Sequence, residues 1–387
     1  YPPPRNISSS RHRAPQAAAS PTRRSRVKNG KQAGRETTST LPSPSASAND
    51  SSTTATPYSQ NFEQNLSDHQ VYLPRRQIRD RNSGGNGNDK ADNLSTIRRR
   101  LEAPRRSLDP TTFPKTAYGQ FTDAHWAATK EADITASAFP YIEGNPTTNS
   151  LQQYASRDTR FTNLAPLTDG TISQAKPDIT YGARPEQLDG EIRNQLNKQI
   201  VPFTDSSLPV APNFFVEFKG PAGSSAVANR QACYYGALGA RAMDVLHSYQ
   251  PAHDQKDNQQ QQRQPPTSVS EVCNDAYAVT ATYLHGQLTL NSSHSTKPAA
   301  VDQQGCQGRP TYIMTPLRSF SVANDIETFC AGAAAYRNAR DWAAEAKDEA
   351  IARANRRLAE ARASRANLEL DLVVQEEGQG RIDPVLV

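Results

Sequence analysis

Residues 213–219 read Asn-Phe-Phe-Val-Glu-Phe-Lys and carry the clearest strand signal in the chain. Three phenylalanines and one valine fall within five consecutive positions, which is typical of a buried strand. The sequence Gly220-Pro221-Ala222-Gly223 then ends the strand, and Ser224 or Ser225 is suited to cap a long helix running to about Tyr249. A buried strand that leads into a long helix indicates an α/β fold.

Two charged residues lie within this apolar strand. Side chains two positions apart on a strand share a face, so Glu217 and Lys219 project together while Val216 and Phe218 pack on the other side. Buried charge is costly unless it is paired or bound to a metal. The pair is therefore either a structural ion pair or a site in which the carboxylate holds a metal ion and the lysine positions water.

A second acidic residue is expected to join this pair. Asp178 begins a short predicted strand, 178–181, that could lie beside 213–219 and bring Asp178 next to Glu217. Two carboxylates and a backbone carbonyl form an oxygen site suited to Mg²⁺.

Neighbouring helices offer further candidates. Gln231 and Tyr235 are four positions apart and share one face of the helix that follows the strand. Upstream, Glu131 lies within a predicted helix, 122–139, and Glu143 is an alternative to it.

Taken in chain order, the candidates resemble the PD-(D/E)XK nuclease superfamily over roughly residues 120–250. The pattern is a helix with an acid, a strand with Asp, a strand with Glu-x-Lys and a helix with Gln-x-x-x-Tyr. The stretch 165–355 is also similar to fungal proteins of uncharacterised activity. The resemblance implies a restriction-endonuclease-like mixed sheet flanked by helices, and cleavage of DNA or RNA that depends on Mg²⁺ or Mn²⁺.

The resemblance also implies roles for single residues. Asp178 and Glu217, with Glu131, would hold the metal, Lys219 would orient or activate the attacking water, and Gln231 with Tyr235 would support the site. One departure from the family pattern is the spacing: Asp178 and Glu217 are 39 positions apart, whereas the family usually joins these strands by a short turn. Either a predicted helix at 186–200 and a proline-rich loop are a tolerated insertion, or Asp178 is not the true partner.

Charge is divided unevenly along the 387 residues, whose formal net charge is +5. Residues 1–112 hold 19 basic and 9 acidic side chains and are rich in Ser, Thr, Pro and Asn, so we expect a disordered basic arm there. Basic runs such as Arg98-Arg99-Arg100 are typical of nuclear import signals or phosphate-attracting tails, and equally of solvated segments. The arm would draw nucleic acid to the domain, and we expect an intracellular, nuclear protein.

The domain itself is expected at 113–355, followed by a solvated helical extension and tail at 356–387. Within it we expect a disordered Gln-rich insertion at 250–271 and further strands at 276–284, 287–291 and 311–322, then a helix from 326.

Several classes of protein and site are disfavoured. No window approaches the ~18 consecutive apolar residues of a membrane span, so no membrane partner is expected. The four cysteines form no C-x-x-C pair and are expected to be reduced and packed, and His285 and His294 are expected at the surface.

The function with which the sequence agrees best is metal-dependent nucleic acid cleavage. The alternative is an inactive nuclease-fold module that binds nucleic acid or protein.

Overall fold

The computed structural model describes residues 54–74, 90–144, 154–251, 274–296 and 309–379. Its centre is a seven-stranded mixed sheet with the order β1-β7-β6-β5-β4-β3-β2. The pairs β1/β7 and β4/β5 are parallel, and the other neighbours are antiparallel. The strands are β1 (Val71–Tyr72), β2 (Tyr154–Arg157), β3 (Ile179–Ala183), β4 (Val210–Lys219), β5 (Ala278–Leu284), β6 (Gln287–Thr296) and β7 (Thr311–Ser321).

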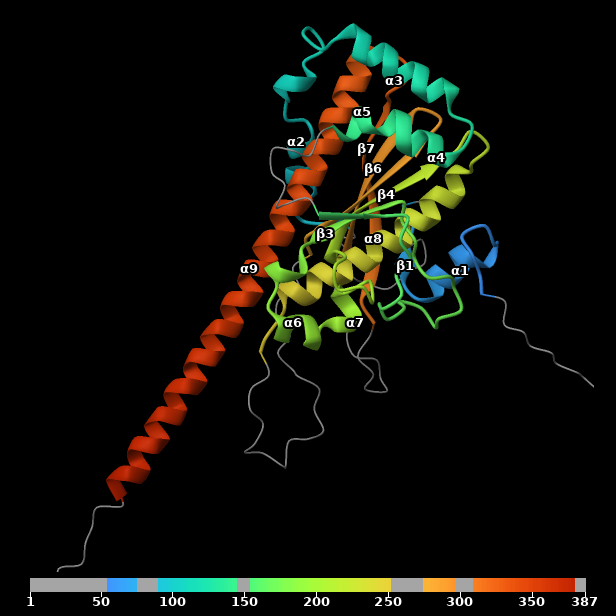
Figure 1. Cartoon of the computed structure of the whole chain (residues 1–387). Coiled ribbons are helices and arrows are strands. Elements are labelled where there is room, and N and C mark those ends of the chain that lie inside the picture. Colours follow the sequence, from blue (N-terminus) through green and yellow to red (C-terminus); the bar gives the residue numbers. More distant parts are fainter. Residues whose placement is uncertain (1–53, 75–89, 145–153, 252–273, 297–308, 380–387) are drawn as a thin grey trace, which may run out of the picture. The chain divides into compact units, whose positions relative to one another are not determined.

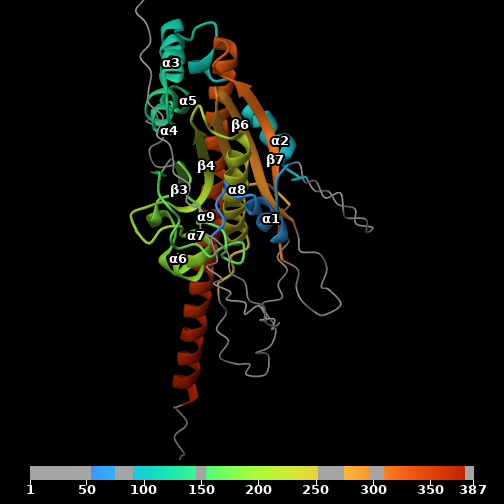
Figure 2. The same ribbon diagram turned by 90° about the vertical axis from the view of Figure 1, so that its right-hand side faces the viewer.

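Two long helices cover the two faces of the sheet, α8 (Ser225–His247) and α9 (Ile326–Gln379) (Figures 1 and 2). The alternation along β4 explains this arrangement. Phe214 packs 5.4 Å from the Tyr336 ring of α9, whereas Phe215 packs 6.3 Å from the Tyr235 ring of α8. Because β4 has apolar residues on both faces, it lies fully buried between the helices.

The expected α/β class, the strand at 213–219 and the long helix after it are confirmed. The strands expected at 276–284, 287–291 and 311–322 correspond to β5, β6 and β7. Helix α9 begins where Asp325 Oδ1 accepts a hydrogen bond from Thr328 N at 2.6 Å, and its residues 359–370 lie almost wholly in solvent. The insertion expected at 250–271 falls almost entirely outside the described residues.

The arm expected at 1–112 is wrong in part, because ordered elements lie inside it. They are α1 (Asn61–Asp68), β1, α2 (Leu94–Leu101) and η1 (Arg106–Leu108). Phe62 and Leu66 are buried in the core on the α8 side, and Ile97 and Leu101 in the core on the α9 side. Each pair is four residues apart and forms a short helical stripe that an average composition over 112 residues conceals. Residues 1–53 and 75–89 lie outside the described part of the chain.

Two expected helices are interrupted. In place of one helix at 122–139, the chain forms α3 (Lys115–Ala127), α4 (Glu131–Asp133), a π-helical turn (Ile134–Ala138) and α5 (Phe139–Glu143). Pro140 lies in the first turn of α5, where a proline removes no helical hydrogen bond.

The helix expected at 186–200 is likewise divided, into η4 (Pro185–Gln187), α6 (Gly190–Gln195) and α7 (Asn197–Ile200). Within this segment Leu188, Ile192 and Ile200 are buried in the core.

The two histidines differ from each other. His285 is exposed at the β5–β6 turn, as expected, but His294 is fully buried in β6, which corrects its expected surface position. Cys233 and Cys330 are free and buried, in agreement with packed thiols, and the other two cysteines lie outside the described residues.

Candidate functional site

The pairing of β3 with β4 brings Asp178 opposite Glu217. Ile179 pairs with Val216 in this antiparallel register, so the next positions outward are Asp178 and Glu217. Directly opposed residues share a face of the sheet, with Cβ atoms about 4.5–5.5 Å apart. The amide N–H of Phe218 also donates to Asp178 Oδ2 at 2.6 Å. The long insertion between the two strands, which includes α6 and α7, therefore leaves the expected neighbours side by side.

Lys219 is held by several oxygen atoms at the end of β4. Its Nζ lies 2.5 Å from Glu217 Oε1, donates to the carbonyl of Phe218 at 2.7 Å and lies 3.5 Å from Glu131 Oε1. Glu217 and Lys219 are 3% and 2% exposed, whereas the side chain of Glu131 is 44% exposed. Gly223 closes the following loop over this group, since a side chain at Gly223 would meet Lys219 Cβ at 2.5 Å. The Glu217–Lys219 ion pair is therefore buried, and Glu131, which contacts Lys219, is the member of the group that is exposed to solvent.

The short helix α4 presents Glu131 to the site. Asp133 Oδ2 accepts hydrogen bonds from Thr129 N at 2.9 Å, Thr129 Oγ1 at 2.8 Å and Lys130 N at 3.2 Å, which fixes the turn that precedes Glu131. The backbone of α4 also packs against Gly220, where an added Cβ would lie 3.2 Å from Glu131 N.

Glu143, the alternative to Glu131, has other partners. Its carboxylate accepts hydrogen bonds from Arg157 at 2.7 and 2.9 Å and from the Tyr181 hydroxyl. Tyr181 packs against Phe214 on the α9 face of the sheet. Glu131 is therefore the acid that reaches Lys219.

Gln231 and Tyr235 meet on α8, as their spacing predicted. Gln231 Nε2 donates to the Tyr235 hydroxyl at 3.1 Å. Burial raises the pKa of Tyr235 well above its ordinary value, and the charge of Glu217 raises it further. The structure thus gathers all six candidate residues at the carboxyl end of β4: Glu131, Asp178, Glu217, Lys219, Gln231 and Tyr235.

Burial and mutual repulsion shift the pKa values of the carboxyls. Burial, and then the charge of Asp178, raises the pKa of Glu217 to about 8. Burial raises the pKa of Asp178 to about 6, although the Phe218 amide and Lys219 oppose this shift. Burial disfavours the charge on Lys219, but the surrounding carboxylates outweigh it and raise the pKa of its ammonium group. Additional positive charge beside Asp178 and Glu217 would relieve this repulsion.

Two buried acceptors at the site have no donor within the described part of the chain. They are Glu217 Oε2 and Gln231 Oε1. Unsatisfied buried acceptors are costly, and a bound cation is one way to satisfy them. Among the described residues no group of three or more His, Cys, Asp and Glu side chains is placed to hold a metal ion. The carboxylates of Asp178 and Glu217 and the amide oxygen of Gln231 are oxygen donors of the kind that Mg²⁺ and Mn²⁺ prefer.

Two contributors at this site could not be read from the sequence. The amide of Phe218 holds Asp178, and no sequence pattern marks such a backbone donor. Thr282 of β5 is paired with Glu217 and buried, and only the parallel register of β4 and β5 identifies it.

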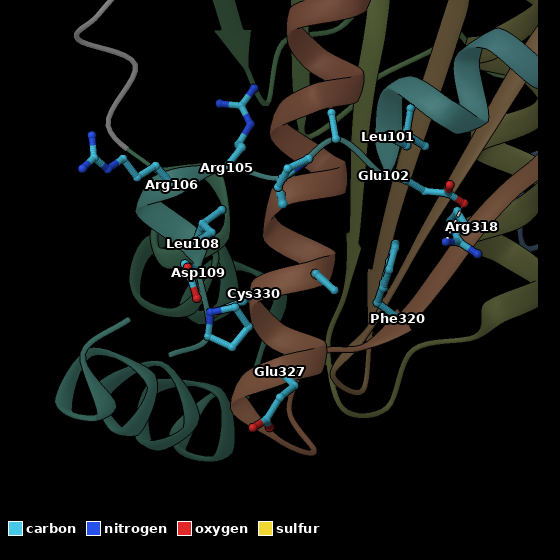
Figure 3. Close-up of a pocket in the computed structure, with 15 residues that line it drawn as sticks. Leu101, Glu102, Arg105, Arg106, Leu108, Asp109, Arg318, Phe320, Glu327 and Cys330 are labelled. Carbon is cyan, nitrogen blue, oxygen red and sulfur yellow. Dashed lines mark ion pairs between the residues drawn. The ribbon is translucent and has the colours of Figure 1, made fainter. Parts of the chain in front are cut away.

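A cavity of about 370 Å³ lies elsewhere, on the α9 side of the sheet (Figure 3). Apolar side chains such as Leu101, Leu108 and Phe320 line it, and Glu102 and Arg318 form an ion pair of 2.7 Å at its edge. Phe320 belongs to the core beneath α9, whereas Glu217 and Lys219 share the face of Phe215 beneath α8. The cavity is thus separate from the carboxylate site.

Comparisons of the chain with protein-family models, curated proteins and solved structures found no match. Within the described residues, no helix is both long and apolar enough to cross a membrane.

Proposed function

We propose that this chain is a nuclease that hydrolyses phosphodiester bonds of DNA or RNA with Mg²⁺ or Mn²⁺. The observation that carries the proposal is the pairing of Asp178 with Glu217 across β3 and β4, with the Lys219 ammonium group 2.5 Å from Glu217. A mixed sheet flanked by helices, with the acids, the lysine and the glutamine on successive elements, supports a restriction-endonuclease-like fold.

Each residue then has a distinct role. Asp178 and Glu217 would hold the cation, and Gln231 would add its amide oxygen while bonded to Tyr235. A bound divalent cation supplies Lewis-acid polarisation of the phosphate and a water of lowered pKa. Lys219 is placed to orient that water or to stabilise developing negative charge. Glu131 Oε1 lies 3.5 Å from Lys219 Nζ, so we assign Glu131 to positioning the ammonium group and not to direct ligation of the metal.

Cleavage of labelled DNA and RNA, single- and double-stranded, tests this function. We expect products with Mg²⁺ or Mn²⁺, none with EDTA, and none from Glu217→Gln. Glu217→Gln keeps the side-chain volume and an oxygen near Lys219, so a folded but inactive variant is the expected result. If the wild-type chain cleaved none of the four kinds of substrate with either metal, the proposal would be wrong.

One observation favours a second candidate, a nuclease-fold module without activity that binds nucleic acid or protein. Glu217 and Lys219 neutralise each other in a buried pair, and such pairs also occur as structural elements. This candidate predicts binding that weakens steeply with salt and does not depend on metal. Metal-dependent cleavage that Glu217→Gln removes would exclude it.

The basic residues near the start of the chain support a nucleic acid partner and a nuclear destination. Residues 1–50 carry nine basic and two acidic side chains, and six of those basic residues lie within 11–28. Such a segment attracts polyanions over a distance set by ionic strength.

A further inference from the structure

Trp126 is a large aromatic side chain in an unusual position. It lies in the last turn of α3 and is 73% exposed, whereas Trp342, the other tryptophan of the chain, is half-buried in α9. Single apolar side chains are common on protein surfaces, so exposure alone assigns no function. What distinguishes Trp126 is a fixed backbone beneath it and a short connection to the candidate site.

The last turn of α3 is anchored by the neighbouring residue, His125. Its ring is buried, its Nδ1 lies 2.9 Å from the Tyr283 hydroxyl, and it stacks on Phe121 at 6.2 Å with an interplanar angle of 13°. The β5–β6 turn packs closely on it, since a side chain at Gly286 would come within 3.2 Å of His125 Nε2. Trp126 therefore projects from a rigid turn, which lowers the entropy cost of binding on its ring.

The segment after Trp126 leads directly to the candidate site. Glu131, five residues later, lies 3.5 Å from the Lys219 ammonium group, and hydrogen bonds to Asp133 fix the segment between them. Five residues span at most about 18 Å, which is roughly five stacked nucleotides at about 3.4 Å each. The end of α3 and helix α4 both lie at the end of the sheet where β4 finishes (Figure 1).

We propose that Trp126 is a stacking platform for an unpaired base of a single-stranded nucleic acid whose backbone reaches the candidate site. The inference rests on the proposed function and narrows its substrate class to strands with unpaired bases. An exposed aromatic ring stacks on any base face, and bases become available for stacking when they are unpaired. Lys130, exposed between Trp126 and Glu131, adds a positive charge suited to a phosphate.

The test uses the fluorescence of Trp126 in the full chain. In a Trp342→Phe background the only indole is Trp126, and the protein is titrated with a short oligothymidylate in EDTA at low salt. We expect saturable quenching, and we expect Trp126→Ala to weaken the affinity about 5- to 150-fold while Trp126→Phe keeps most of it. Leu368→Ala, which removes another exposed apolar side chain, should leave the affinity unchanged. Should Trp342→Phe fail to fold, the difference in quenching between wild type and Trp126→Phe gives the same information.

Two further measurements test the role of Trp126: the cleavage kinetics of Trp126→Ala and the affinity for a duplex. Trp126→Ala should raise KM with kcat within a few-fold, because the ring lies away from the reacting atoms. A blunt-ended GC-rich duplex without loops or overhangs should bind more weakly than the single strand. Cleavage with no quenching and an unchanged KM in Trp126→Ala would overturn the inference and leave the proposed function standing, as would equal binding of this duplex. No binding of any nucleic acid would remove both.

Discussion

The ammonium nitrogen of Lys219 lies 2.5 Å from Oε1 of Glu217, and both residues are at most 3% exposed in a strand whose other side chains are mostly apolar. Oε2 of the same carboxylate is buried and has no donor among the described residues. Half of the carboxylate is therefore satisfied by the lysine and the other half is open to a cation.

Divalent cations should stabilise the protein against heat. A ligand that binds only the folded state adds about 2.7 kcal/mol at a hundredfold excess over its Kd. We expect Mg²⁺ or Mn²⁺ to raise the Tm of the wild type at pH 8, and Asp178→Asn to lose most of that rise. Because the pKa of Asp178 is raised to about 6 and that of Glu217 to about 8, binding displaces protons and the rise should shrink at pH 6.

A control carboxylate lies outside the site. Asp189 accepts hydrogen bonds from Arg362 at 2.8 and 3.1 Å, and Asp189→Asn should keep the metal-dependent rise in Tm. An equal rise in Asp178→Asn and wild type would place the metal elsewhere.

Residues before 113 should contribute to folding stability. Ile97 of α2 is fully buried in the core on the α9 side, so Ile97→Ala should lower the free energy of unfolding by about 2–4 kcal/mol, measured by urea titration. Thr96→Ala changes an exposed neighbour on the same helix and should have little effect. A negligible effect of both variants would mean that α2 does not belong to the folded core.

The first 50 residues should act on substrate binding and not on the chemical step. Deleting them removes nine basic and two acidic side chains. We expect KM for nucleic acid to rise, the salt dependence of binding to become less steep, and kcat to stay within a few-fold. Unchanged KM and salt dependence would show that these charges do not touch the substrate. Deleting residues 1–112 would not test this idea, because α1, β1 and α2 would be lost too.

Stability should fall in mild acid because of His247. Burial lowers the pKa of His247 to about 4, while its ring lies 4.3 Å from that of Tyr277. The unfolded chain has the ordinary pKa near 6.5, so between about pH 6.5 and 4 it binds more protons than the folded chain and the free energy of unfolding decreases as pH falls. His247→Gln should reduce this loss by roughly 2 kcal/mol, measured by urea titrations at pH 7 and 4.5. A slope equal to that of wild type would contradict a neutral His247 in the folded chain.

Local periodicity was enough to predict much of this fold. The pattern at 213–219 gave β4 and its two faces, and the proline and glycine that follow marked the start of α8. The neighbourhood of Asp178 and Glu217 also followed from two short strands, because opposite residues in a sheet share a face. These features could be predicted because they depend on residue types and their spacing within short segments.

The remaining features depend on contacts between distant segments. The Phe218 amide that holds Asp178 has no side-chain signature. His294 is buried because β6 lies inside the sheet, and neither its identity nor its neighbours indicate that. Helices α1 and α2 fold onto the domain because four apolar residues are buried in its core. These residues are Phe62, Leu66, Ile97 and Leu101, and the polar sequence around them hides their helical periodicity.

Single-turnover cleavage by two lysine variants distinguishes a catalytic Lys219 from a structural one. Lys219→Met removes the ammonium group beside Glu217, whereas Lys347→Met removes a lysine that is equally buried in α9 and donates to the carbonyl of Gly182 at 3.1 Å. With the Tm of each variant recorded, we predict that Lys219→Met slows Mg²⁺-dependent cleavage at least about 100-fold and that Lys347→Met stays within a few-fold of wild type. Equal rates for a folded Lys219→Met and the wild type would contradict the proposed catalytic site.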